Sequence, residues 1–256
     1  MSKDEFFDLK DMKFDVVIGN PPYQNSTTED KSSNLWTLFW AKCLDLAKDD
    51  GVVSLITPTT WLSPSRDFKS AKYGHSKSAK YGHSGDVRLW DSFNRYTSVA
   101  DIDTISDHFK GVGSTFGRVT VYKNGRDGLS FTGGYPTEYG FLPNSDIEGS
   151  LSRISLTNNL ASKYRLTQEA KSNDIRVSVP MTRLFNKDPD MVEILQPGQS
   201  GSSASDDPRS YCYVHVTSQE EAEQVKELII SCSDILCDSC RWVGFINLKV
   251  VGLLAV

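Results

Sequence analysis

Residues 14–23 read Phe-Asp-Val-Val-Ile-Gly-Asn-Pro-Pro-Tyr, and this stretch decides the fold. Its first part is an apolar run that contains one acid and stops at a glycine, which is typical of a buried parallel strand that runs into a loop. In open α/β sheets, ligands bind at the carboxyl ends of the strands. We therefore expect a strand over residues 14–19 and a ligand-binding loop over residues 20–23.

The chemistry of this loop suits a planar ligand that carries an amino group. Pro21 and Pro22 fix the backbone and remove two donors, so the carbonyl groups of Asn20 and Pro21 are free to accept hydrogen bonds from another molecule. The Asn20 side chain adds an acceptor, and Tyr23 offers a flat ring with a polar tip. The alternative is a plain turn that ends the strand, because Asn and Pro are common turn residues.

The next segment predicts a second strand beside the first. Ser33 is a candidate N-cap for a helix that extends to about residue 48, and its apolar residues recur at helical spacing. A second apolar strand follows over residues 52–56, and the loop 57–61 comes after it. Short links between strand, helix and strand predict a right-handed βαβ unit whose two loops lie side by side.

These residues carry a resemblance to a known family. The stretch FDVVIGNPPY resembles motif IV of the S-adenosylmethionine-dependent amino-methyltransferases, most closely the adenine-N6 DNA methyltransferases of phage and type IIG-like restriction-modification systems. In that family an LW-containing helix, an acidic or glycine turn, an apolar strand and a TP…WL pattern follow. Here Leu35-Trp36, Gly51 and the segment 57–62 match these features in the same order, over about fifty residues.

The resemblance implies an α/β fold, with a partial Rossmann-like methyltransferase sheet followed by a smaller mixed α/β or irregular recognition region. We expect the catalytic half in residues 1–132 and the target-recognition region in residues 133–256. The implied reaction is methyl transfer from S-adenosylmethionine to adenine N6 in double-stranded DNA. The resemblance implies four catalytic residues. Asn20 and the Pro21 carbonyl accept the two N6 hydrogens, Pro22 belongs to the same loop, and Tyr23 stacks on the base.

The cofactor side of this reaction is harder to find in the chain. The family carries a motif similar to F-x-G-x-G at the end of an earlier strand, but only about a dozen residues precede residue 14. Residues 124–256 contain no strand pattern followed by a Gly-x-Gly turn and a helix. We therefore expect the N-terminal cofactor half to be missing, with a second chain as a candidate supplier. Asp15 and Gly19 are the cofactor-binding candidates within the sequence.

Further substrate contacts are predicted downstream. Alternation of apolar and polar residues predicts strands over 98–106 and 116–122, and the resemblance makes Phe116 a candidate for stacking on the other face of the base. Core packing is the alternative for Phe116.

The segment 151–190 has 7 basic and 4 acidic residues, which favours DNA contacts, although an exposed polar subdomain explains it nearly as well. The candidate DNA contacts are Arg153, Arg165 and Arg176, together with Lys163 and Arg183.

Composition limits the class of protein. The chain has 256 residues, a net charge of -5 and 38% hydrophobic residues, which is ordinary for a globular protein. No apolar run is long enough for a membrane span, and residues 2–5 do not resemble a signal peptide. Five cysteines, an odd number, in a chain whose start does not resemble a signal peptide favour a reducing cytoplasm. Cys232, Cys237 and Cys240, with His215 upstream, could bind zinc, but ordinary free thiols are the better interpretation, and we expect no metal.

Two features leave their interpretation open. The eight residues 69–76 are repeated identically as residues 77–84. Their lysines, tyrosines and histidines could contact phosphates or bases, or the segment could be a solvated insertion. The missing cofactor motif also leaves alternatives for the function. These are a non-catalytic DNA-binding remnant and a methyltransferase acting on RNA or on protein glutamine, and the polar C-terminal half favours DNA over glutamine.

Overall fold

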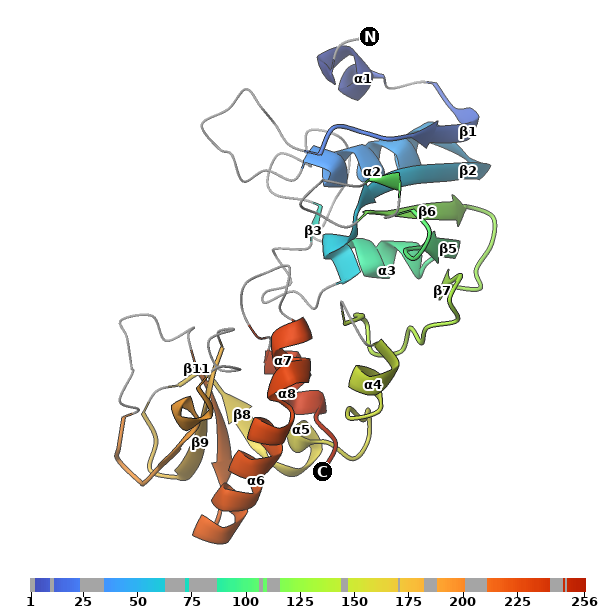
Figure 1. Ribbon diagram of the computed structural model, residues 1–256. Coiled ribbons are helices and arrows are strands. Elements are labelled where there is room, and N and C mark those ends of the chain that lie inside the picture. Colours follow the sequence, from blue (N-terminus) through green and yellow to red (C-terminus); the bar gives the residue numbers. More distant parts are fainter. Residues whose placement is uncertain are drawn as a thin grey trace. The chain divides into compact units, whose positions relative to one another are not determined.

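The computed structural model divides into two compact units; the described residues up to Phe141 belong to the first and those from Leu142 onward to the second. Figure 1 shows the elements of both units. The structure describes residues 3–9, 12–23, 35–62, 72–73, 87–105, 108–109, 116–143, 147–169, 171–181, 188–200, 211–239, 246 and 248–256. Only two residues of the repeat at 69–84 fall within these ranges, so its role stays a prediction.

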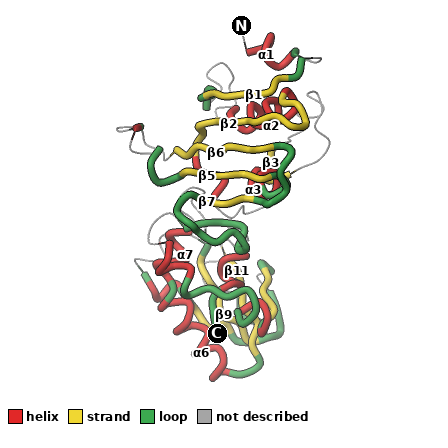
Figure 2. Tube along the Cα trace, turned by 90° about the vertical axis from the view of Figure 1, so that its right-hand side faces the viewer, coloured by secondary structure: helices red, strands yellow, loops and turns green. Residues whose placement is uncertain are grey.

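The first unit is built on a five-stranded sheet with the strand order β1-β2-β6-β5-β7, which Figure 2 shows as adjacent strands. The sheet is mixed, since the pairs β1/β2 and β5/β7 are parallel and the pairs β2/β6 and β5/β6 are antiparallel. Its strands are β1 (Phe14–Gly19), β2 (Ala47–Pro58), β5 (Thr97–Asp101), β6 (Phe116–Tyr122) and β7 (Leu129–Phe131). The other elements of this unit are α1 (Lys3–Asp8), α2 (Leu35–Leu46), α3 (Leu89–Phe93), a 3₁₀ turn (Thr59–Leu62), and the short pair β3 (Lys72–Tyr73) and β4 (Val87–Arg88).

The predicted strand, helix and parallel strand are confirmed as β1, α2 and β2. Helix α2 ends at Leu46 and β2 begins at the next residue, so the second strand is longer than the apolar run 52–56. The predicted cap at Ser33 lies outside the described residues. Because β1 and β2 are parallel, the loops that follow them emerge at the same edge of the sheet.

One face of this sheet is covered by α2 and α3. Trp40 of α2 is fully buried, and its indole Nε1 donates to Thr57 Oγ1 of β2 at 3.2 Å. The Trp40 ring also packs edge-on against Phe93 of α3, with ring centroids 4.7 Å apart. Val119 and Val121 of β6 lie on this buried face, as the alternation in the sequence predicts. The core of the first unit therefore lies between these helices and the sheet.

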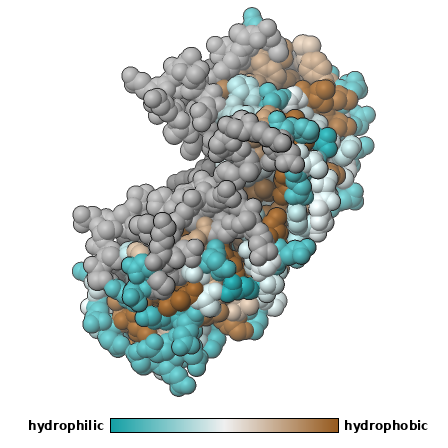
Figure 3. Space-filling model, in the orientation of Figure 1, coloured by the Kyte–Doolittle hydropathy of each residue, from teal (hydrophilic) through white to brown (hydrophobic). Residues whose placement is uncertain are grey.

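The opposite face and the β1 edge are open, which corrects the prediction of a buried first strand. Val16 and Ile18 are 58% and 75% exposed, and Tyr122 on β6 is 42% exposed. Figure 3 shows hydrophobic surface in the region of β1. Among the described strands, β1 pairs only with β2, so its other edge has no strand partner. The apolar sequence of β1 predicts burial, but a strand is buried only where other elements cover it, and the described residues leave Val16 and Ile18 exposed.

The second unit is built on an antiparallel four-stranded sheet with the order β10-β9-β11-β8. Helix α6 packs on its apolar face, where Val177 of β9, Val214 of β11 and Ala222 of α6 are all completely buried. Its strands are β8 (Arg165–Thr167), β9 (Ile175–Pro180), β10 (Glu193–Leu195) and β11 (Tyr211–Val216). Its helices are α4 (Ile147–Leu151), α5 (Leu160–Lys163), α6 (Gln219–Ser231), α7 (Ser233–Ser239) and α8 (Leu248–Leu253), with a 3₁₀ turn at Pro189–Met191.

Helix α6 carries apolar residues at helical spacing, and Ala222, Val225 and Ile229 are buried. Ser218 caps it, because its side chain accepts a hydrogen bond from the Glu221 backbone N–H at 3.1 Å. The polar segment 151–190 contributes two strands of a packed sheet, and the middle of β9 is buried throughout. The fold is thus α/β with a mixed sheet in the first unit and an antiparallel sheet in the second.

Candidate functional site

The loop 20–23 follows the carboxyl end of β1. Gly19 pairs with Leu55 of β2, and β2 then continues to Pro58. Within the loop Asn20 and Pro22 are exposed and Pro21 is buried. The buried proline ties the loop to the protein, while the amide of Asn20 remains accessible to a ligand.

Tyr23 folds back onto this loop. Its hydroxyl donates a hydrogen bond to Oδ1 of Asn20, and the side chain is partly buried. Burial raises the pKa of Tyr23 above its ordinary value. The phenol therefore stays protonated near neutral pH and serves as a donor.

Phe116 lies next to Tyr23. It begins β6 opposite Pro58 at the end of β2, and it is 1% exposed. The ring centroids of Tyr23 and Phe116 are 4.9 Å apart, with the planes tilted by 36°. The structure thus brings together two aromatic residues that are predicted at one site although 93 positions separate them in the sequence.

The sequence analysis missed Phe109, which packs against Phe116 with a centroid separation of 4.7 Å and a tilt of 30°. The available signal was an aromatic residue at each end of the glycine-rich segment 109–116. That signal does not say whether the two rings meet, because glycine-rich chain has wide conformational freedom.

The two cofactor candidates are not gathered around Asn20. Asp15 lies near the amino end of β1, about 16 Å along an extended strand from residue 20. Its carboxylate is exposed and pairs with Lys48 Nζ at 2.7 Å, and that hydrogen bond lowers the pKa of Asp15. At Gly19 an added Cβ would meet only Leu55 Cδ2, at an ordinary distance of 3.7 Å. Neither position forms a cradle that would hold a cofactor.

Three of the four arginines predicted to contact DNA have protein partners. Arg153 donates to Asp234 at 3.1 Å, and Arg165 donates to Asp174 at 2.9 Å. Arg176 is completely buried on β9, where it donates to the backbone carbonyls of Glu169 and Gln199 and lies over the Tyr213 ring. In this structure Arg176 presents no surface to DNA, and the other two would have to exchange a carboxylate for a phosphate.

The remaining sequence candidates do not form a further centre. Lys163 is exposed and lies over the ring of Tyr164, whereas Arg183 lies outside the described residues. The described part of the chain contains no group of three or more potential metal ligands, and Cys240 is not described. His215 is engaged on both sides, with Nδ1 2.8 Å from Asp174 Oδ2 and Nε2 2.9 Å from Thr167 Oγ1.

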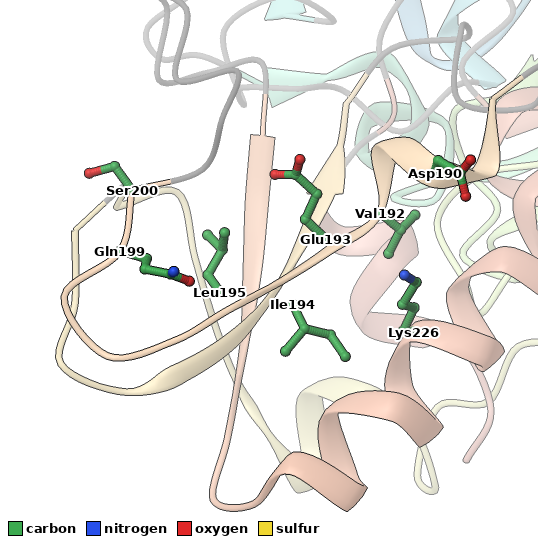
Figure 4. A pocket seen from close by; sticks show the side chains of 8 residues that line it. All are labelled: Asp190, Val192, Glu193, Ile194, Leu195, Gln199, Ser200 and Lys226. Carbon is green, nitrogen blue, oxygen red and sulfur yellow. The ribbon is translucent and has the colours of Figure 1, made fainter.

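A separate cavity of about 500 Å³ lies along the outer edge of β10 in the second unit (Figure 4). Glu193 and Leu195 of β10 line it together with Lys226, which comes from α6. The described residues that line it are Asp190, Val192, Glu193, Ile194, Leu195, Gln199, Ser200 and Lys226. No aromatic ring is among these described residues, so they do not resemble a second base-binding site.

Comparison with known proteins bears on the part of the chain that holds the loop 20–23. Residues 1–80 match the sequence model of the Eco57I restriction-modification methylase family. The match supports a restriction-modification methylase family. It covers 80 of the 256 residues and includes β1, the loop, α2 and β2, but not Phe116. A sequence search of curated proteins gave no match. None of the described helices is long and apolar enough to cross a membrane.

Proposed function

We propose that this chain provides the acceptor side of an S-adenosylmethionine-dependent DNA methyltransferase that modifies adenine N6 in a restriction-modification system. The observation that carries the proposal is the loop 20–23 at the carboxyl end of a parallel strand, inside the segment that matches the methylase family. The loop combines carbonyl acceptors with an adjacent aromatic pair, Tyr23 and Phe116. An amino-bearing purine needs both kinds of contact.

The role of the chain's residues follows from the chemistry of the base. Adenine N6 cannot be reached inside the stacked duplex, so the base has to be flipped out at a cost of a few kcal/mol. Asn20 Oδ1 and the Pro21 carbonyl accept the two amino hydrogens, which orients the nitrogen lone pair away from them. Tyr23 stacks on the ring and fixes its plane. These residues contribute positioning and polarisation rather than acid–base chemistry.

The described residues do not form a site for S-adenosylmethionine, which restriction-modification methylases typically use as the methyl donor. The carboxylate of Asp15 is taken by Lys48, and it lies toward the wrong end of β1. No strand among the described residues leads through a Gly-x-Gly turn into a helix. We therefore propose that another polypeptide segment supplies the donor site.

The open edge of β1 is where this segment would add. An unpaired strand edge exposes backbone donors and acceptors, which proteins normally cover. Val16 and Ile18 expose apolar side chains beside that edge, and strands of parallel sheets are usually covered on both faces. A second chain that adds a parallel strand here would bring its own strand-end loop next to Asn20.

Double-stranded DNA is the proposed acceptor, with the second unit as the candidate recognition region. Arg153, Arg165 and Lys163 are the basic residues that would contact phosphates. Two of them, Arg153 and Arg165, would first have to leave their acidic partners. Phosphate contacts from such residues would position the duplex rather than read its sequence.

The test is methyl transfer from tritiated S-adenosylmethionine to an adenine-containing duplex, by the full chain and by the chain mixed with a candidate partner. Asn20→Ala is expected to abolish incorporation of the tritiated methyl group into adenine. Asn124→Ala, which changes an exposed asparagine of the same unit, is the matched control and should retain it. Incorporation that survives Asn20→Ala would contradict the assigned role.

The misfit of the cofactor site favours one other function, a non-catalytic DNA-binding remnant. Calorimetry separates the two, because a remnant would bind duplex but would not bind S-adenosylmethionine with any partner. Replacing the duplex by RNA or by a glutamine-containing peptide in the methyl-transfer assay tests the other acceptors.

A further inference from the structure

Three aromatic rings follow one another at the carboxyl edge of the first sheet. Phe116 lies in the middle, with the Tyr23 ring at 4.9 Å and the Phe109 ring at 4.7 Å between centroids. The tilts of 36° and 30° are similar. These are ordinary separations for offset aromatic pairs.

No planar ligand fits between Tyr23 and Phe116 in this arrangement. A ring inserted between two others needs two van der Waals contacts, so the flanking rings have to stand about 7 Å apart. Their centroids are 4.9 Å apart. One of the two rings must move before a base can enter.

Tyr23 already makes the contacts that the base is proposed to make. Its ring packs on Phe116, and its hydroxyl donates to Asn20 Oδ1, the atom that would accept an adenine amino hydrogen. Substrate binding therefore replaces an internal partner at both places. The free site is closed by its own tyrosine.

The two flanking rings differ in how firmly they are held. Phe116 is 1% exposed and belongs to β6, which pairs with strands on both sides. Tyr23 belongs to a loop, beyond the end of an edge strand, and is only partly buried. Tyr23 is thus the ring that can leave, and Phe116 is the wall that remains.

We propose that Phe109 is a positioning residue that keeps the Phe116 ring in place while Tyr23 gives way to the base. This inference rests on the proposed function, since it places the adenine ring against Phe116, with the displaced Tyr23 stacked on its other face. Phe109 does not touch the base. It supports the ring that does, because the Phe109 ring packs against Phe116 and keeps that contact when Tyr23 moves.

The experiment uses the full chain labelled with 3-fluorotyrosine, and fluorine NMR follows the Tyr23 resonance, which Tyr23→Phe identifies by its loss. Without ligand, Phe109→Leu should shift this resonance because the Phe116 ring current changes. Phe6→Leu is the matched control, since Phe6 belongs to α1 and packs against Phe39 with ring centroids 5.0 Å apart. It should leave the resonance unchanged.

Adenosine is the probe for the displacement. We expect saturating adenosine to shift the Tyr23 resonance of the wild type. In unlabelled protein, calorimetry should show that Tyr23→Phe binds adenosine about two- to tenfold more tightly, because the hydrogen bond to Asn20 no longer has to be broken. Phe109→Leu should weaken binding severalfold, and Phe6→Leu should not.

The outcomes separate this inference from the proposed function. If Phe109→Leu leaves the ligand-free Tyr23 resonance as in the wild type, the positioning role is overturned, whatever the methyl-transfer assay gives. If adenosine leaves the resonance in place, or if Tyr23→Phe binds more weakly, the displacement is overturned. Methyl transfer that does not depend on Asn20 would instead overturn the proposed function and leave the ligand-free result standing.

Discussion

The sheet of the first unit leaves an apolar edge strand exposed, whereas the sheet of the second unit buries a charged side chain in a central strand. Ile18 on β1 is 75% exposed, and Arg176 on β9 is completely buried. The difference shows that the neighbours of a strand decide its burial. Among the described strands, β1 pairs on one side only, while β9 lies between β10 and β11. The backbone carbonyls of Glu169 and Gln199 accept hydrogen bonds from Arg176.

Two buried cysteines allow the units to be compared directly, and here we expect the largest effect. Burial raises the pKa of Cys43 in α2 and of Cys212 in β11 to about 12. At pH 8 this lowers the thiolate fraction about a thousandfold relative to an ordinary thiol. Mass spectrometry after brief iodoacetamide treatment should find both unmodified in the native chain and both alkylated in urea.

The relative rates of these two reactions sharpen the comparison. Because the first sheet is open on one face, we expect Cys43 to become reactive at a lower urea concentration than Cys212. Equal rates at every concentration would show that the two units unfold together. Rapid alkylation of either thiol in native buffer would contradict its burial.

The second prediction compares two apolar residues of the first sheet. Leu55 is 2% exposed, so Leu55→Ala should lower the free energy of unfolding by about 2–5 kcal/mol. Ile18→Ala removes a side chain that is already in water and should change it by less than about 0.5 kcal/mol. Urea denaturation followed by circular dichroism measures both. A comparable loss for Ile18→Ala would mean that β1 is covered in solution, for instance by a second copy.

The contrast also explains how far the sequence predicts this molecule. Hydrophobic periodicity predicts β1, α2, β2, β6 and α6, because local pattern determines which segments become strands or helices. It does not predict that β1 is an exposed edge or that Arg176 is buried, since both depend on which segments pair across long separations. Figures 1 and 2 show the strand order from which these outcomes follow.

The candidate site divides in the same way. The loop 20–23 is recognisable because two prolines and an asparagine directly follow an apolar strand, and Phe116 could be proposed from the resemblance. The contact of Tyr23 with Phe116 needs the register that places Phe116 opposite Pro58. Phe109 depends on the path of a glycine-rich segment, and no periodicity encodes that path.

The third prediction compares two arginines of the second unit. Arg176→Ala removes a completely buried side chain, which opens a cavity, and it takes the donor from two backbone carbonyls, so we expect a loss of about 3 kcal/mol in the free energy of unfolding. The side chain of Arg165 is 60% exposed, and Arg165→Ala should cost at most about 1 kcal/mol. Urea denaturation tests both, and equal losses would remove the distinction between a structural arginine and a surface arginine available to DNA.

The smallest expected effect is the pH dependence of stability that comes from one exposed aspartate in each unit. The hydrogen bond with His215 lowers the pKa of Asp174, with a further contribution from Ser172, and Lys48 lowers the pKa of Asp15 in the first unit. A lowered pKa in the folded state stabilises the protein above the unfolded pKa, which is about 3.9 for Asp. That stability disappears as the pH falls through the folded value.

Asp174→Asn should therefore lower the urea midpoint at pH 7, and the difference from the wild type should shrink as the pH falls from about 4 toward 3. Asp15→Asn is the counterpart in the first unit and should follow the same trend, since its partner Lys48 stays charged throughout this range. Both effects are small because both carboxylates are exposed and screened by solvent. A midpoint difference for Asp174→Asn that stays constant down to pH 3 would contradict the lowered pKa of Asp174.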